Sequence, residues 1–223
     1  MNRSDLTTRV LIELGESSTA PVFWDTDEVH TILQDAQESM AEAIGGIKRT
    51  AMLSLEAGAM FYPLRAIAPD LLRITRIWSP SRDMRLTSVT RDQLDRHHEL
   101  WRTVTGSPEN YLSMGYDWIG VWPVPATSGI LLRIDYTAWP RTLDSDSDWP
   151  EFLEADHETL VRYGVYDGLM KRWDVEQAEA AFQEYEFRVG LGHSRSGTDK
   201  AKARNWQKGS APASSFRSNV RTP

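Results

Sequence analysis

The stretch DTDEVHTILQDAQESMAEAIGG, residues 25–46, decides the fold class because it carries the start, the body and the end of a helix. Asp25 can cap the first turn with Glu28 turning back toward it, and Gly45 with Gly46 ends the segment. Its apolar side chains recur at steps of three and four residues: Val29, Ile32, Leu33, Ala36, Met40, Ala43 and Ile44. The spacing predicts an amphipathic helix with one face packed on other elements.

Three further helices follow from the same kind of pattern. Residues 6–14 predict a short helix that Gly15 stops. After Pro150 one element carries the apolar residues Leu153, Leu160, Val161, Val165, Leu169 and Trp173. A last helix, capped by Asp174 with Gln177, carries the apolar seam Val175, Ala178, Phe182, Tyr185 and Val189. We expect the two C-terminal helices to form an antiparallel hairpin on the helix of residues 25–44, with Gly164 and Gly168 allowing a close helix contact.

Residues 50–143 have a different texture, with short β-branched and aromatic runs punctuated by proline. This texture is typical of strands, and the short connections favour antiparallel pairing. The predicted strands are residues 50–56, 71–78, 85–89, 110–114, 118–122 and 130–136. One insertion, residues 90–102, predicts a short helix with Leu94 and Trp101 facing inward.

These segments predict an α+β fold, in which a helix bundle is interrupted by a mainly antiparallel β region and followed by an extended tail. We divide the chain into N-terminal helices at 1–49, a β-rich insertion at 50–149, a C-terminal helical hairpin at 150–192 and a flexible basic tail at 193–223.

Composition excludes several classes of protein. The chain of 223 residues has 40% hydrophobic and 26% charged residues and no cysteine, so it is neither disordered overall nor held by disulfides or thiolate metal sites. No apolar run approaches the ~20 residues that cross a bilayer, and residues 1–15 lack the apolar region of a signal peptide. We therefore predict a chain that does not enter a membrane.

Charge is unevenly distributed along the chain. Residues 193–223 contain seven basic residues and one acidic residue, so the tail carries +6 and the remainder −13 of the total −7. The tail is also rich in Gly and Ser, a composition that predicts disorder until a partner binds. Its large aromatics Trp206 and Phe216, flanked by Arg204, Lys208 and Arg217, are our candidate partner-binding residues. The alternative is a frayed terminus with incidental aromatics.

Motifs that would carry chemistry are incomplete. Asp144, Asp146 and Asp148 begin like a calcium loop, but Trp149 replaces the required glycine. His157 and Glu158 begin a zinc-protease motif that has Val161 where the second histidine should stand. We therefore predict no catalytic residue, no metal site and no cofactor. Paired carboxylates of a glycoside hydrolase, or a sugar platform built from the nine tryptophans, stay open as alternatives.

The order of segments resembles the head-to-tail adaptor, or connector, proteins of tailed phages, including tubular adaptors. Four features over most of the chain carry the resemblance. They are the helix entry Phe23 to Glu28, the strand entry Pro69 to Ile74, the Trp122 to Pro125 stretch before residues 130–136, and the paired C-terminal helices after Pro140 and Leu143. None of these features is a catalytic signature.

The resemblance implies a structural virion protein of the phage neck, assembled in the host cytoplasm. Such adaptors form rings, usually dodecamers, that bind below the portal protein, extend the DNA channel and dock tail or nozzle proteins, with DNA only as passing cargo. Acidic or mixed charge suits a channel through which DNA must slide. The tail is then expected to reach the portal or a neighbouring subunit. A tail or baseplate subunit remains the alternative, and it would assemble without binding portals.

Overall fold

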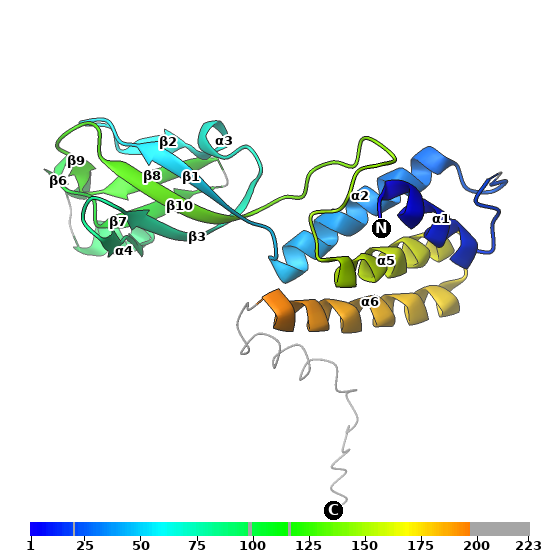
Figure 1. Ribbon diagram of the computed structural model, residues 1–223. Coiled ribbons are helices and arrows are strands. Elements are labelled where there is room, and N and C mark those ends of the chain that lie inside the picture. The colour runs from blue at the N-terminus through cyan, green and yellow to red at the C-terminus, as the bar shows by residue number, and fades with distance from the viewer. Residues whose placement is uncertain (20, 98–99, 116, 197–223) are drawn as a thin grey trace, which may run out of the picture.

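The computed structural model describes residues 1–19, 21–97, 100–115 and 117–196, with side chains of residues 97 and 191–196 left out (Figure 1). The fold is α+β, as predicted: a helix bundle lies beside a β region that is inserted between the second helix and the C-terminal pair.

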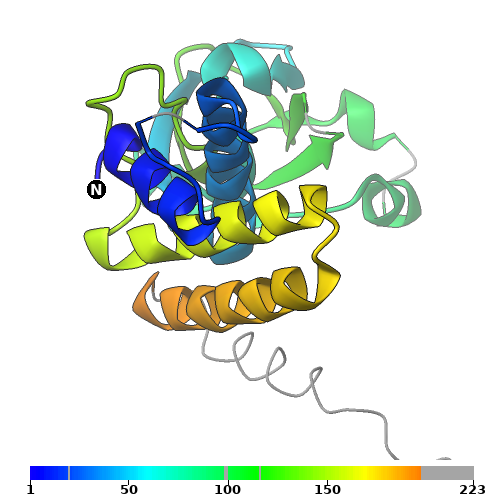
Figure 2. The same ribbon diagram turned by 90° about the vertical axis from the view of Figure 1, so that its right-hand side faces the viewer.

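The bundle contains α1 (Arg3–Glu13), α2 (Thr26–Ile44), α5 (His157–Lys171) and α6 (Val175–Ser196). Helices α5 and α6 run antiparallel and pack on α2, which confirms the predicted arrangement (Figures 1 and 2). The apolar faces of the helices meet in one core. Its members include Leu6, Val10, Leu11, Leu14, Trp24, Val29, Leu33, Met40, Ile44, Leu160, Val161, Val165, Leu169 and Tyr185.

The helix ends follow the sequence signals with one correction. The Asp25 side chain accepts a hydrogen bond from the Asp27 amide, and Gly45 takes the left-handed conformation at φ 62° that ends α2. Glu28 was expected to turn back toward the cap, but its carboxylate binds the Lys171 ammonium on α5. The long Lys171 side chain offers a charged partner, which the cap amide does not.

Two glycines of α5 set the distance to α1. A Cβ on Gly164 would lie 2.9 Å from Val10 Cγ2, and one on Gly168 would lie 2.7 Å from Leu14 Cδ1. Both separations are well inside van der Waals contact. The predicted close approach at these glycines is therefore confirmed, and the partner is α1.

Three residues assigned to apolar seams are exposed. Leu153 lies in extended backbone before the short η2 (Glu154–Asp156), because α5 begins only at His157. Trp173 has φ 60° in the α5–α6 turn, so its side chain leaves the helix face and is 87% exposed. Val175, the first residue of α6, is also exposed. The seam prediction was wrong at these positions.

The β region has two four-stranded sheets and a small third one. In sheet A, all neighbours are antiparallel, in the order β1 (Lys48–Ser54), β10 (Leu131–Ala138), β3 (Leu71–Ser79) and β4 (Met84–Arg85). Sheet B has the order β2 (Phe61–Pro63), β8 (Trp118–Trp122), β7 (Asn110–Met114) and β5 (Thr87–Ser88). The pair β6 (Thr105–Gly106) and β9 (Val124–Pro125) is parallel, as is β5 with β7.

The main core of the β region joins inward side chains of the two larger sheets. Its large buried members come from both sheets and their connections: Leu55, Leu64, Ile77, Leu86, Ile119, Val121, Leu132 and Ile134. Ala41 of α2 also packs in this core. The four-residue helix α3 (Leu64–Ile67) contributes to this core. Helix α4 (Arg91–His97) and η1 (Trp101–Thr103) place Leu94 and Trp101 against Leu112 of sheet B, so the predicted inward direction of both residues is confirmed.

Most predicted strands match the observed strands within two residues, but their pairing differs in places. Residues 85–89 were expected to form one strand, whereas residue 85 belongs to sheet A and residues 87–88 to sheet B. The buried Leu86 between them turns the chain from one sheet to the other. The strand at 61–63 was not predicted, because Pro63 argues against a strand, and it pairs at a sheet edge where proline is tolerated.

The β region enters and leaves the bundle through one neck. Its first and last long strands, β1 and β10, pair with each other, and Lys48 lies opposite Thr137 at the end near the bundle (Figure 1). The Arg49 guanidinium binds Asp70 in the β region and Glu151 in the segment that leads to α5. This ion-pair chain ties the neck to the bundle side.

Candidate interaction surfaces

Sheet A carries a basic surface on the side away from its core. Residues opposite each other on neighbouring strands share a face, so the register defines its rows. One row runs Met52, Arg133, Trp78 and Arg85 across all four strands. The next rows pair Thr50, Asp135 and Arg76, and then Lys48, Thr137 and Arg73. We call this surface the basic face, defined by its cations Lys48, Arg73, Arg76, Arg85 and Arg133.

Asp135 is the carboxylate within these rows. Arg76 Nη2 lies 2.6 Å and Arg133 Nε 3.1 Å from its oxygens, and the Thr50 hydroxyl donates at 3.1 Å. Burial would raise the pKa of Asp135, but these hydrogen bonds outweigh burial and lower it. Asp135 therefore stays ionised and orients two arginines, while the face keeps a positive balance. The Arg76 guanidinium also lies 5.6 Å from the Trp78 ring centre.

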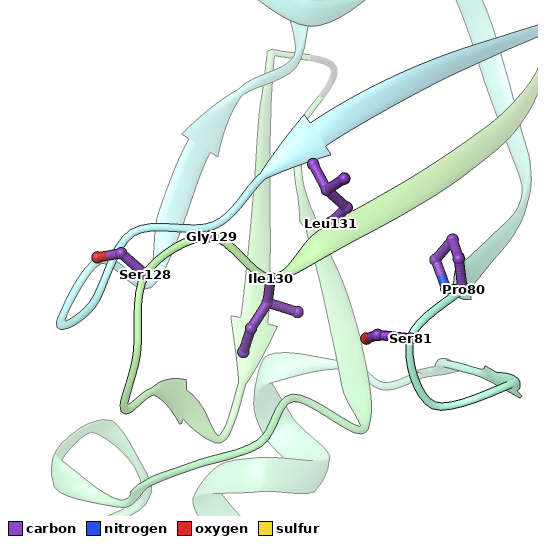
Figure 3. A pocket seen from close by; sticks show the side chains of 6 residues that line it. All are labelled: Pro80, Ser81, Ser128, Gly129, Ile130 and Leu131. Carbon is purple, nitrogen blue, oxygen red and sulfur yellow. The ribbon is translucent and has the colours of Figure 1, made fainter.

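Apolar side chains border the basic face. Met52 and Leu131 are each about half exposed, at 52% and 46%. Beside Leu131 the surface is hollowed between the end of β3 and the start of β10, with a volume of about 510 Å³ (Figure 3). The hollow is lined by Pro80, Ser81, Ser128, Gly129, Ile130 and Leu131. The face thus combines cations with an apolar recess at one end.

The outer side of α6 has the opposite character. Ala178, Tyr185 and Val189 are buried against the bundle, which leaves the other side of the helix open to solvent (Figure 2). We call this side the acidic helix face, defined by its exposed residues Glu176, Glu179, Ala180, Gln183, Glu186 and Phe187. Three of the six are carboxylates, and Phe187 is 68% exposed. Among these six residues, this side of α6 therefore combines three negative charges with one large apolar side chain.

The net charges of the bundle and of the β region differ in the same sense as the acidic helix face and the basic face. Residues 1–47 and 144–192, which form the bundle and its lead-in, contain 22 acidic and 6 basic residues. Residues 48–143, the β region, contain 9 acidic and 12 basic residues. The bundle thus carries −16 and the β region +3, although the whole chain is acidic.

A third surface lies at the end of the bundle, where the α1–α2 loop and the α5–α6 turn meet (Figure 1). Exposed apolar side chains there are Val22, Phe23, Met170 and Trp173. The Lys171 ammonium lies 5.4 Å from the Phe23 ring centre and 4.7 Å from that of Trp24. Because Lys171 also binds Glu28, it holds the loop, α2 and α5 together and fixes the shape of this end.

A fourth surface lies on sheet B. Phe61, Met114 and Trp118 are partly exposed and border a shallow hollow of about 490 Å³ with Gly115. Gly120 allows this arrangement, since a Cβ there would lie 2.7 Å from Leu112 Cδ2 and 2.9 Å from Phe61 Cε1. Because this patch is apolar, it suits the apolar surface of a protein partner better than a charged surface.

The groups considered for metal binding have structural contacts. Asp146 binds the Arg3 guanidinium at 2.7 Å, and the carbonyls of Asp146 and Asp148 accept hydrogen bonds from the first amides of α1. His157 is buried, with its Nδ1 2.9 Å from the Met1 nitrogen, and burial lowers its pKa. Within the described ranges no three His, Asp or Glu side chains gather in a way that would hold a metal ion.

The exposed tryptophans are scattered. Trp118 lies on β8, Trp149 in the segment before α5 and Trp173 in the α5–α6 turn. By contrast, Trp24 and Trp101 are core residues. This distribution does not favour the sugar-platform hypothesis, since such a platform needs neighbouring rings.

The predicted partner-binding residues Arg204, Trp206, Lys208, Phe216 and Arg217 lie outside the described residues. The basic face was missed by the sequence reasoning. Its cations are spread over 86 positions, and only the strand register brings them together. The sequence indicates part of this face within one strand: Arg76 and Trp78 flank the apolar Ile77, so both lie on the opposite side of the strand from Ile77.

The described residues present four surfaces with exposed charged or apolar side chains: the basic face, the acidic helix face, the bundle end and the sheet B patch. Within the described parts no helix is both long and apolar enough to cross a membrane. The sequence model of the SU10 adaptor protein family matches residues 1–212, nearly the whole chain, and no curated protein sequence matches it. The chain belongs to this family of phage head-to-tail adaptors, as its sequence resemblance implied, and is a structural phage protein.

Proposed function

We propose that the protein is a ring-forming adaptor that binds below the portal, extends the DNA channel and docks tail or nozzle proteins. The observation that carries the proposal is the set of separate docking surfaces on one subunit: the basic face, the acidic helix face, the bundle end and the sheet B patch. A subunit of a ring placed between two other assemblies needs contacts with neighbours on both sides, above and below. Membership of the adaptor family supports the same reading.

DNA is passing cargo in this proposal. The bundle carries −16, and several of its carboxylates, including Asp27, Glu38 and Glu42 on α2, are not on the acidic helix face. A channel wall with such charge repels phosphates and does not trap the moving duplex. Tight binding of the DNA backbone phosphates would need a dense lining of cations on the channel wall.

The tail is proposed to bind the portal or a neighbouring subunit through Trp206 and Phe216, with Arg204, Lys208 and Arg217 meeting acidic groups. Large aromatics in a Gly- and Ser-rich segment can provide most of the contact energy when the segment orders on a partner. The tail charge of +6 also complements the acidic bundle of an adjacent copy.

The test is to mix the purified full chain with purified portal rings and to follow particle mass by light scattering and shape by negative-stain microscopy. We expect stacked rings on the portal. Particles that form without any affinity for portals would support a tail or baseplate subunit. A chain that stays monomeric with portals present would overturn the proposal.

The tail is tested in the same assay with a Trp206→Ala and Phe216→Ala double variant. We expect at least about tenfold weaker stacking, because both anchors are lost. A Ser214→Ala and Ser215→Ala variant is the matched control, since it changes the same segment without removing an aromatic. Equal stacking by both variants would remove the tail from the contact.

A further inference from the structure

We propose that the basic face of one copy binds the acidic helix face of a second copy, in a head-to-tail contact between sheet A and α6. This inference rests on the proposed assembly and names the surfaces that hold neighbouring copies together. The occupant of the basic face is therefore another molecule of this chain.

Charge complementarity is the first argument. The basic face presents five cations with Asp135 as the carboxylate between them. The acidic helix face presents Glu176, Glu179 and Glu186, and its six members include no cation. Opposed fields of this kind orient two proteins during encounter and fix their register.

Shape and size agree with a helix laid across the strands. From Glu176 to Phe187 the helix rises about 16 Å, at 1.5 Å per residue. Four strands about 4.8 Å apart span about 14 Å from the first axis to the last. One side of α6 can thus contact β1, β10, β3 and β4 together.

The apolar groups also match. Phe187 is 68% exposed on the helix face, and Met52 and Leu131 are about half exposed on the sheet. Leu131 also lines the hollow of about 510 Å³ (Figure 3). A phenylalanine side chain can bury against these groups, which would form the apolar centre of a contact with a charged rim. A nucleic acid backbone offers no such partner, and the bundle charge of −16 repels it.

The contact has to be between copies. The acidic helix face points away from the rest of its own bundle, and the basic face belongs to the separate β region (Figures 1 and 2). Because the two surfaces differ, the contact is heterologous and leaves a free surface of each kind after every addition. Such contacts close into rings when the rotation between copies permits.

The first experiment reverses charge on either side of the contact and measures self-assembly by sedimentation velocity. Arg85→Glu and Glu179→Arg should each weaken assembly at least about tenfold. An equimolar mixture of the two variants should assemble again, because every contact can then pair either two native surfaces or two reversed ones. Arg96→Glu is the matched control: it makes the same charge change on α4, outside sheet A, and should assemble like the wild type.

The second experiment uses the absence of native cysteine. A chain with Met52→Cys and Phe187→Cys, treated with a short bismaleimide, should give a ladder of covalent oligomers. Each variant with one of these substitutions should stop at dimers or below. Circular dichroism of every variant checks that the fold is retained.

Failure of the contact between sheet A and α6 can be distinguished from failure of the adaptor proposal. Variants that assemble and stack on portals like the wild type, with no ladder from the double-cysteine chain, would overturn the contact and leave the adaptor standing. A wild type that stays monomeric alone and with portals would overturn both. If Arg85→Glu abolishes binding of a labelled DNA duplex and leaves assembly unchanged, the basic face is a nucleic acid surface and the inference is wrong.

Discussion

Gly168→Ala should destabilise the bundle, although alanine is the better helix former. The new Cβ would lie 2.7 and 2.8 Å from the two Leu14 methyl carbons, where contact distances are about 3.5–4.0 Å. Leu14 is 2% exposed, so it has to shift by about 1 Å within packed surroundings. Such overpacking costs about 1–3 kcal/mol, and the gain in helix propensity returns at most about 1 kcal/mol. We expect a net loss of about 1–2 kcal/mol in the free energy of unfolding.

Gly190→Ala is the matched control, because a Cβ on this glycine of α6 meets nothing within 4 Å. It should stabilise the protein by about 0.5–1 kcal/mol through helix propensity alone. Urea unfolding followed by circular dichroism at 222 nm measures both variants on the full chain. In the Gly168→Ala background, Leu14→Ala should cost less than in the native one, since it also removes the clash. A Gly168→Ala protein as stable as Gly190→Ala would refute the close-contact reasoning.

Two more predictions concern charged groups in the bundle. Burial lowers the pKa of His157 below its ordinary 6.5, so the unfolded chain takes up a proton that the folded chain does not. The free energy of unfolding should therefore fall as pH drops from 6.5 through the lowered pKa, and His157→Gln should flatten this dependence in urea titrations at several pH values. Arg162 lies 2.6, 3.0 and 3.3 Å from carboxylates of α1, α5 and α6, so Arg162→Met should cost about 1–3 kcal/mol in urea unfolding. The exposed Arg65 pair with Asp117 is the control, and Arg65→Met should cost less than about 1 kcal/mol; equal losses would contradict the role of Arg162.

Local patterns in the sequence were enough for most elements of this fold. The α2 helix, the strands at 110–114 and 118–122 and the α5–α6 hairpin follow from periodicity and from caps that act over a few residues. The division of the β region into two sheets does not, because it depends on pairing between distant segments. The switch at Leu86 is an example, since a single buried leucine separates strands that belong to different sheets.

The interaction surfaces were harder to predict than the elements. Trp173 was assigned to an apolar seam because it continued the helical spacing, but a positive φ turns it to solvent. The basic face requires Lys48 to lie three strands and Arg133 two strands from Arg85, and no spacing in the sequence contains that register. The resemblance to phage adaptors rested on the order of segments and did not depend on these details, and the family match over residues 1–212 confirms it.

The neck between the bundle and the β region makes the inserted β region replaceable in evolution or by design. Lys48 of β1 pairs with Thr137 of β10 at the base of the insertion. The two chain ends that join the insertion to the bundle therefore lie side by side, as they do in a short hairpin. The entropy of closing a loop grows only with the logarithm of its length, and here the closure is made once, at the base. The insertion could be exchanged for another sheet module that also covers Ala41 of α2, which packs in the core of the β region.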